Sequence, residues 1–226
     1  MVKLSNRLQM VADLVRPGKI LADIGTDHAY LPVYLILENL ISNAYAADLK
    51  PGPLENARAT VEKYGLSDKV ELVLSDGIRE LKPNCCEDFV IAGMGGNLIS
   101  DILDAVSWIR KPGTHFVLQP QSHAEDLREY LLNSGYEILR ENVTSEGKHM
   151  YLCMEVVYTG EMQSYEKSDF YIGKLPESDS CLKEDYLKFI KKRLEIKRDA
   201  LLKSDPQNED LKYLDEVICD LKECLK

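Results

Sequence analysis

Short apolar runs and helical apolar periods alternate along the first 160 residues of the chain. Apolar runs bounded by Gly, Pro or polar residues predict buried strands, and apolar positions three or four apart predict helices. We expect strands at 19–23, 43–48, 70–75, 89–92 and 115–119. Helices are expected at 29–40, 52–64, 97–107 and 124–133, after a first helix that Ser5 caps and Pro17-Gly18 ends.

This alternation predicts the fold class. Strands that alternate with helices form a parallel sheet with helices on both faces. Two further extended segments, 136–144 and 150–159, are joined by a short polar link at 145–148, which predicts a hairpin. We therefore expect an α/β fold in which an antiparallel pair of strands extends the edge of a parallel sheet.

The pattern changes at about residue 160. Residues 161–180 are polar and irregular, and two helical segments follow, divided by Ser-Asp-Pro at 204–206. The second segment has apolar residues at 211, 214, 218, 221 and 225, which form a heptad seam. We expect an antiparallel helical hairpin, and a division of the chain into a domain at 1–160 and a linker with hairpin at 161–226. Two roles stay open for the hairpin: packing against the domain, and contact with RNA.

Composition narrows the class of protein. Of the 226 residues, 45% are hydrophobic and 29% are charged, as in soluble globular proteins, and no apolar run is long enough to cross a membrane. The N-terminus has no signal-peptide pattern, and the six Cys residues form no Cys-x-x-Cys pair. We expect a cytoplasmic protein with reduced thiols, without metal or membrane association, and a monomer rather than an obligate oligomer.

Charge is distributed unevenly along the chain. The net charge of −10 argues against a nucleic-acid partner, but eight basic residues stand against four acids between residues 183 and 203. Because exposed charges are screened beyond about 10 Å at ordinary salt, a local basic stripe can bind phosphates on an acidic protein. A solvated helix face explains the same pattern equally well. The basic residues are Lys183, Lys188, Lys191, Lys192, Arg193, Lys197, Arg198 and Lys203.

The first strand leads into the stretch Asp23-Ile-Gly25-Thr-Asp27-His28. A strand, a tight Gly turn and a helix form a nucleotide-cofactor loop in α/β sheets, but dinucleotide folds use Gly-x-Gly-x-x-Gly. Here Asp27 replaces the second Gly, and its carboxylate would repel a pyrophosphate. It suits S-adenosylmethionine (SAM), which has an ammonium, a sulfonium and no phosphate. The alternative for this stretch is an ordinary strand-to-helix turn that carries acids. The alternative for His28 is a role in capping the helix or in packing the loop.

Acidic residues also end the next two strands. Asp48 ends the second strand, where an acid binds both ribose hydroxyls in nucleoside-binding folds. Its alternative role, capping the following helix, is weakened because Pro51 and Gly52 intervene. Asp76-Gly77 closes the third strand, where a carboxylate can accept an adenine amino hydrogen and Gly leaves room for the ring. Asp23, Asp48 and Asp76 thus lie at three successive strand ends. Together they favour a nucleoside site more strongly than any one of them does alone.

Three glycines follow the fourth strand in Gly93-Met94-Gly95-Gly96. Such a backbone lets a planar ring approach closely, and this position is where the methyl acceptor meets the methyl group in SAM enzymes. A tight strand-to-helix turn is the alternative. The Asn/Asp-Pro-Pro-Tyr motif of exocyclic-amine methylases is absent from the sequence.

Together these motifs resemble those of a known family. The chain closely resembles the TrmK-type bacterial tRNA (adenine-N1)-methyltransferases, which modify adenine 22 in the D-arm, over nearly its whole length. The motifs that carry the resemblance are Ala-Asp23-Ile-Gly25-Thr-Asp27-His28-Ala-Tyr30-Leu-Pro, Asp48-Leu-Lys-Pro-Gly-Pro-Leu-Glu-Asn56-Ala, Ser-Asp76-Gly77, Ile-Ala-Gly93-Met94-Gly95-Gly96 and Leu-Gln119-Pro120.

The resemblance implies a Rossmann-like class I SAM-dependent methyltransferase domain with a coiled-coil element that engages tRNA. It implies SAM as cofactor and tRNA as partner. The catalytic residues expected are Asp27 and His28. The cofactor-binding residues expected are Asp23, Gly25, Asp27, His28, Asp48, Leu49, Asn56, Asp76, Gly77, Gly93 and Met94. The substrate-binding residues expected are Gly95, Gly96 and Gln119, together with Lys191, Lys192 and Arg193 of the basic stripe.

The chemistry expected is direct methyl transfer. Adenine N1 has an in-plane lone pair and no proton at neutral pH, so it can attack the methyl group without a strong general base. The product base is cationic, and Asp27 is the candidate for stabilising it. N1 lies on the Watson–Crick edge, so the target must be unpaired or flipped.

Three other functions stay open at this point. They are a methyltransferase for a small molecule or a protein, a SAM-fold protein that binds RNA without catalysis, and an NAD-linked oxidoreductase. Turnover without tRNA would indicate the first, and RNA binding without transfer the second. A thermal shift with NAD rather than SAM would indicate the third.

Overall fold

The computed structural model describes residues 2–162 and 164–226, and it has one sheet of seven strands in the order β3-β2-β1-β4-β5-β7-β6. The strands are β1 Leu21–Ile24, β2 Ala44–Asp48, β3 Val70–Leu74, β4 Asp88–Gly95, β5 His115–Ser122, β6 Tyr136–Glu146 and β7 His149–Tyr158. The helices are α1 Asn6–Ala12, α2 Tyr30–Leu37, α3 Pro51–Lys63, α4 Gly96–Asp104, α5 Ala124–Asn133, α6 Asp169–Ile172, α7 Lys183–Ser204 and α8 Asp210–Glu223, with a 3₁₀ turn η1 at Leu175–Glu177.

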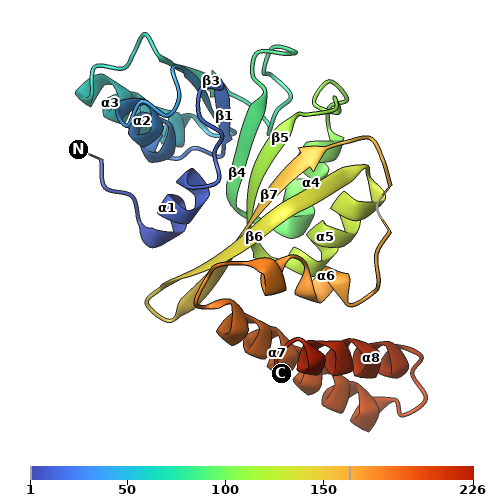
Figure 1. The fold of residues 1–226 in the computed structure, drawn as a ribbon. Helices are drawn as coiled ribbons and strands as arrows, with labels where there is room; N and C mark the ends of the chain where they lie inside the picture. The colour runs from blue at the N-terminus through green and yellow to red at the C-terminus, as the bar shows by residue number, and fades with distance from the viewer. Residues whose placement is uncertain (1, 163) are drawn as a thin grey trace.

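The sheet confirms the expected α/β class. Strands β1 to β5 pair in parallel, and β7 pairs antiparallel with both β5 and β6. Helices α2 and α3 cover one face of the sheet and α4 and α5 the other (Figure 1). Successive residues of β4 alternate between the two faces: Phe89 and Ile91 join the core under α4 and α5, whereas Val90 joins the core under α1 to α3. This is the two-residue period of a strand that is buried on both faces.

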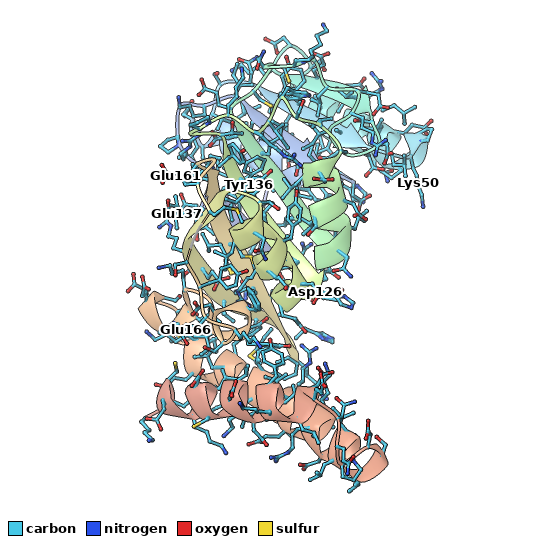
Figure 2. The ribbon with its side chains drawn as sticks, turned by 90° about the vertical axis from the view of Figure 1, so that its right-hand side faces the viewer. Lys50, Asp126, Tyr136, Glu137, Glu161 and Glu166 are labelled. Atoms are coloured by element: carbon cyan, nitrogen blue, oxygen red, sulfur yellow. The ribbon has the colours of Figure 1, made fainter. Side chains whose placement is uncertain are left out.

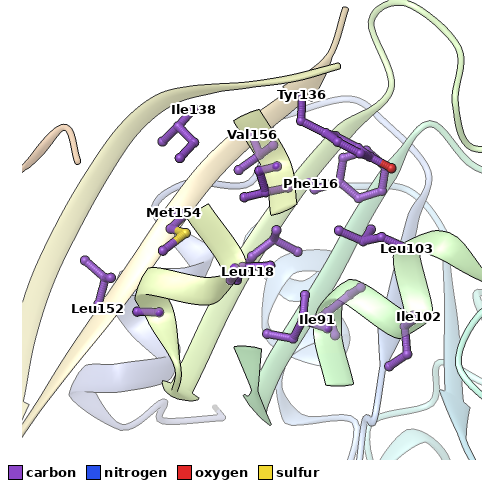
Figure 3. Packing of buried hydrophobic residues seen from close by; sticks show 14 of the residues in the cluster. Ile91, Ile102, Leu103, Phe116, Leu118, Tyr136, Ile138, Leu152, Met154 and Val156 are labelled. Atoms are coloured by element: carbon purple, nitrogen blue, oxygen red, sulfur yellow. The ribbon is translucent and has the colours of Figure 1, made fainter. Parts of the chain in front are cut away.

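Aromatic rings link the parallel strands to the terminal hairpin. Phe116 of β5 stacks on Phe89 of β4, with ring centroids 5.3 Å apart, and meets the edge of Tyr136 of β6 at 5.6 Å. Such pairs contribute about 0.5–1.5 kcal/mol each beyond their area burial. Figure 3 shows Phe116 and Tyr136 packed beside Leu103 of α4. This contact layer extends the core continuously across β4, β5 and β6.

Several element bounds differ from those expected. The fourth strand reaches Gly95 rather than residue 92, because parallel pairing with β5 continues through a register shift around Gly93, whose φ is +84°. The second helix ends at Leu37 rather than residue 40, because Asn39 takes a left-handed conformation with φ +57°. The α4 helix ends at Asp104 rather than residue 107. Ser5 caps α1 as expected, accepting a hydrogen bond from the Leu8 N–H.

The C-terminal part forms the expected helical hairpin. Leu187, Ile190 and Leu194 of α7 and Leu214 and Ile218 of α8 are buried at its seam. The hairpin lies across one end of the sheet, and in Figure 2 Asp126 of α5 lies closer to it than Lys50 at the start of α3. The segment before it, expected to be irregular, contains the short helices α6 and η1.

A buried ion pair attaches this segment to the domain. The Nε of Arg128 on α5 donates to Glu141 of β6 at 2.8 Å, and both side chains are almost wholly buried. The same guanidinium donates to the Phe170 carbonyl, and Glu141 accepts from the Lys174 N–H, each at 2.8 Å. Because α6 and the residue that precedes η1 are held at both charges of the pair, the position of the hairpin that follows is restrained.

Candidate active site

The loop after β1 is locked between its two neighbouring strands. The N–H groups of Gly25 and Thr26 both donate to the Ala47 carbonyl at the end of β2, at 2.8 and 3.0 Å. Gly25 has a φ of +78°, and a Cβ built there would lie 2.3 Å from the Cε of Met94. The left-handed backbone favours glycine, and any larger residue would also have to displace the end of the Met94 side chain. The loop therefore brings the carboxyl ends of β1, β2 and β4 together.

Asp23 is a buried carboxylate at this junction. Its side chain accepts a hydrogen bond from Thr26 Oγ1 at 2.6 Å and is only 6% exposed. Burial raises the pKa of Asp23 to about 6, the Thr26 hydrogen bond opposes this, and the charge of Asp48 adds to it. No basic group of the described residues lies within 4 Å of either carboxylate. The two acids thus form a site that favours a cation.

The start of α2 places three polar residues at the surface. Asp27 has a φ of +50°, which is uncommon for a residue other than glycine, and its side chain is two-thirds exposed. Its carboxylate lies 3.6 Å from the His28 Nε2. The His28 ring stacks on the ring of Tyr30, with centroids 5.1 Å apart. No side chain caps α2, so His28 has a stacking contact rather than a capping role.

Asp48 and Asp76 end β2 and follow β3 as expected. Asp48 accepts the N–H of Lys50 at 2.9 Å, and no side chain caps α3, so the alternative role of Asp48 as a helix cap is not observed. Asp76 is exposed, with its carboxylate 3.5 Å from the Nε of Arg79. Leu49 and Leu74 are more than half exposed at the same strand ends. Apolar side chains flanked by carboxylates suit a nucleoside, whose base is planar and whose ribose is polar.

The glycines after β4 have different surroundings. Gly93 is exposed and its N–H donates to the Oε1 of Gln119 at 3.1 Å. A Cβ built at Gly95 would lie 3.3 Å from Ser122 Oγ, and one at Gly96 only 2.1 Å from the His123 carbonyl oxygen. Gly96 thus permits α4 to start directly against the end of β5. Near the third strand end, Gly77 packs on α4, where a Cβ would meet Ile102 at 3.1 Å.

Gln119 is fully buried beneath the loop. Its Oε1 accepts from the Gly93 N–H and from the Nη1 of Arg7, and its Nε2 donates to the Pro120 carbonyl. A side chain engaged in this way orients its neighbours rather than presenting a free amide at the surface. The sequence pattern singled out Gln119 but not Arg7, which lies 112 positions away.

Asn56 lies apart from the strand-end acids. It is exposed on α3, where it lines a hollow of about 350 Å³ together with His28, Tyr30 and Lys3. The structure therefore associates Asn56 with the His28 side of the loop.

A polar groove leads from the site to the helical hairpin. Its volume is about 680 Å³, and it runs from Gln121 and Ser122 at the end of β5, past Lys148 and His149, to Arg193 and Lys197 of α7. Arg193 lies 3.6 Å from Glu125 and 5.8 Å from the Phe189 ring, which is 46% exposed.

Of the three basic residues expected to bind substrate, only Arg193 lines this groove; Lys191 and Lys192 do not. Lys148 of the hairpin turn is a groove residue that the sequence pattern did not indicate.

The described residues offer neither a metal-binding cluster nor a membrane-spanning helix. In the ranges 2–162 and 164–226 there is no group of three or more His, Cys, Asp or Glu side chains that could hold a metal ion. Within the same ranges, no helix is long and apolar enough to span a membrane.

Comparison with known proteins shows clear relatives. Residues 4–154 match the methyltransferase domain family model. The tRNA (adenine(22)-N(1))-methyltransferase of Bacillus subtilis is 40% identical over 157 residues, which cover 69% of this chain and 64% of that enzyme.

Solved structures match the whole chain. The B. subtilis m1A22 tRNA methyltransferase TrmK superposes with a TM-score of 0.85 at 28% identity and covers all of both chains. TrmK of M. capricolum, in complex with the cofactor product S-adenosylhomocysteine, has a TM-score of 0.81 at 27% identity and covers 98% of this chain and 97% of its own. The similarity therefore includes the C-terminal hairpin as well as the sheet.

Proposed function

The chain belongs to the methyltransferase domain family and, within it, to the TrmK-type group, and we propose that it transfers the methyl group of SAM to N1 of adenine 22 in tRNA. The observation that carries this proposal is the carboxylate pair of Asp23 and Asp48 around the Gly25 loop, in a fold that matches TrmK along its full length. A cation-binding nucleoside site fits SAM and does not fit a pyrophosphate cofactor. The absence of tRNA dependence would favour a small-molecule or protein substrate instead.

The residues around the loop have the chemistry to bind SAM. Their order along the sheet matches the order of the ammonium, ribose and adenine groups in SAM. Asp23 binds the ammonium of the methionine part, directly or through water, because it is buried without a cationic partner among the described residues. Asp48 keeps one carboxylate oxygen for the ribose hydroxyls while the other accepts from Lys50. Asp76 accepts a hydrogen bond from the adenine amino group, and the exposed side chains of Leu49 and Leu74 flank the adenine ring. The remaining proposed cofactor contacts are Gly25, His28, Asn56, Gly77, Gly93 and Met94.

SAM, when bound, supplies a methyl group that is made electrophilic by the sulfonium. The protein has to align the adenine N1, the methyl carbon and the sulfur, and positioning of this kind can supply roughly 7–11 kcal/mol of the barrier. The N1–methyl bond forms as the carbon–sulfur bond breaks, its electron pair passing to sulfur, and the base becomes cationic. Asp27, exposed beside the loop and paired with His28, stabilises this charge. The reaction as proposed uses no metal ion.

The tRNA lies along the groove that joins the glycine loop to α7. Lys148, Arg193 and Lys197 supply cations for its phosphates, and Phe189 supplies an exposed ring for stacking. Lys191 and Lys192, outside the groove on the same helix, extend the basic surface. The glycine loop, with Gly95 exposed in part and Gly96 behind it, faces the target base. Gln119 takes a positioning role because it is buried.

Two further parts of the proposal concern organisation. The methyltransferase domain comprises residues 1–160, and residues 161–226 form the linker and the hairpin that contacts RNA. The enzyme acts as a monomer in the cytoplasm, where its substrate is found. Because phosphate contacts dominate such interfaces, tRNA affinity should fall steeply as the salt concentration rises.

Methyl transfer from labelled SAM to an unmodified tRNA transcript tests this proposal. We expect label in the RNA that elutes as N1-methyladenosine after digestion to nucleosides. A thermal shift with SAM but not with NAD is the accompanying control for the cofactor. Label in another nucleoside, or transfer that does not require tRNA, would contradict the proposed substrate.

A further inference from the structure

Arg7 reaches the glycine loop from the opposite end of the sequence. It lies in the first turn of α1, and its Nη1 donates to the Gln119 Oε1 at 3.0 Å. The same oxygen accepts the Gly93 N–H at 3.1 Å. The guanidinium therefore lies one side chain away from the backbone at which the methyl acceptor is proposed to sit.

Three contacts hold Arg7 in this position. Its main-chain N–H donates to Glu146 Oε1 at 2.6 Å, and the neighbouring Asn6 amide donates to the Ser145 carbonyl at 3.1 Å, so α1 is attached to the end of β6. The guanidinium lies over the Tyr151 ring of β7, 5.9 Å from its centroid. A cation held by a ring and a hydrogen bond loses little conformational freedom when it binds an anion.

The guanidinium of Arg7 makes no close ion pair within the described residues, although the carboxylate of Glu146, which accepts the Arg7 main-chain N–H, interacts with its charge at longer range. Among residues 2–162 and 164–226, no carboxylate oxygen lies within 4 Å of its guanidinium nitrogens, although nine other arginine and histidine side chains have such a partner. Arg7 is also partly exposed. In a chain of net charge −10, a held guanidinium that no carboxylate contacts directly is a feature that an incoming anion can use.

A second donor converges on the same space. A Cβ built at Gly93 would lie 3.6 Å from the Arg7 Nη1 and 3.6 Å from the Nε2 of Gln121. Gln121 is exposed and also lines the groove that leads to α7. A guanidinium and an amide donor beside an exposed glycine form the donor set that phosphate oxygens require.

We propose that Arg7 and Gln121 bind a backbone phosphate next to the target adenosine, and so hold the nucleotide while its base lies at the glycine loop. This inference rests on the proposed function, because the anion is a phosphate of the tRNA substrate. The site gives the groove an anchor at its catalytic end. It also assigns α1 a direct part in substrate binding, in addition to packing against the sheet.

The salt dependence of tRNA binding separates this role from a merely structural one. We would measure kcat and KM for tRNA at several salt concentrations, and the Kd for SAM, with wild type and with Arg7→Gln. Loss of one phosphate contact should raise KM for tRNA roughly 10- to 100-fold. It should also make the slope of log KM against log salt shallower by about 0.7 to 1, with SAM affinity unchanged within about twofold.

Matched variants complete the design. Arg58→Gln removes the same charge from the exposed face of α3, and its salt slope should equal that of wild type. Arg7→Lys keeps the charge, so it should keep the slope while losing part of the affinity. Gln121→Ala should raise KM several-fold with no change of slope, because the amide is neutral.

The outcomes separate a failure of the phosphate site from a failure of the proposed function. If wild type forms no N1-methyladenosine in tRNA, the proposed function fails. If wild type is active and Arg7→Gln keeps the wild-type slope, the phosphate site is wrong, whatever happens to kcat or to SAM affinity. If Arg7→Gln does not fold, the proposal is decided by Arg7→Lys and Gln121→Ala, and wild-type KM values in both would overturn it.

Discussion

Replacing Asp23 by Asn should stabilise the free protein at neutral pH while it weakens SAM binding. Burial raises the pKa of this carboxyl to about 6 from its ordinary value of 3.8. Since each pKa unit corresponds to about 1.4 kcal/mol, the charged form is less favourable in the folded protein by about 3 kcal/mol. The Asn side chain removes the charge and keeps an oxygen that can accept the hydrogen bond from the Thr26 hydroxyl.

The pH dependence of this effect has a definite sign. Because the folded pKa is the higher one, the folded protein binds more protons at this site than the unfolded chain between about pH 4 and about pH 6. The wild-type free energy of unfolding therefore falls, through this group, as the pH rises across that window. The Asn variant lacks this decrease, so its advantage should be close to zero at about pH 4 and reach up to about 3 kcal/mol above about pH 7.

Urea unfolding across this pH range, with SAM titration by calorimetry at neutral pH, measures both effects. We expect a higher unfolding midpoint for Asp23→Asn at about pH 7.5, and a SAM affinity lower by about tenfold or more, the size of a lost charge-assisted hydrogen bond. Asp68→Asn, which removes an exposed carboxylate, serves as the control and should change neither quantity. A stability difference that does not vary with pH, or an Asn variant that is less stable at neutral pH, would show that the buried Asp23 carboxylate does not destabilise the folded protein.

Three other substitutions test separate parts of the site. Gly25→Ala should lose SAM binding and about 1–3 kcal/mol of stability, because alanine is strained in the left-handed conformation at φ +78° and its Cβ would displace the end of the Met94 side chain; calorimetry and urea unfolding would measure this, and normal SAM binding would contradict it. Arg128→Ala should lower the free energy of unfolding by about 3–5 kcal/mol, because it leaves Glu141 buried without its partner; a loss below about 1 kcal/mol in urea unfolding would contradict it. Asp27→Asn should reduce kcat for methyl transfer while SAM affinity is partly retained, and an unchanged kcat would remove Asp27 from the mechanism.

Much of the fold could be predicted because its signals are local. Strand–helix alternation, Gly25 in a tight turn and the apolar seam that includes Leu214 and Ile218 each depend on a few neighbouring residues. The carboxyl ends of parallel strands meet at one edge of a sheet, so the positions of Asp48 and Asp76 followed from the strand assignment. These parts of the sequence specified the fold class and the strand ends at which we propose that the cofactor binds.

Other features depend on contacts between distant segments. Helix α6 was missed because its position depends on the buried pair of Arg128 and Glu141. Arg128 donates to a main-chain carbonyl 42 residues away, and Glu141 accepts from a main-chain N–H 33 residues away. Arg7 was missed because nothing near it in the sequence indicates Gln119. The burial of Gln119 likewise follows from the way β5 lies under the glycine loop, which its neighbouring residues do not reveal.

The most direct test of the central claim uses two tRNA transcripts that differ only at position 22. With labelled SAM and purified protein, we expect N1-methyladenosine in the transcript with adenine at this position. We expect no methyl incorporation when guanine replaces that adenine, although both transcripts should bind with similar affinity because phosphate contacts dominate binding. Equal methylation of the two transcripts would contradict the account, because the target would then lie elsewhere in the RNA.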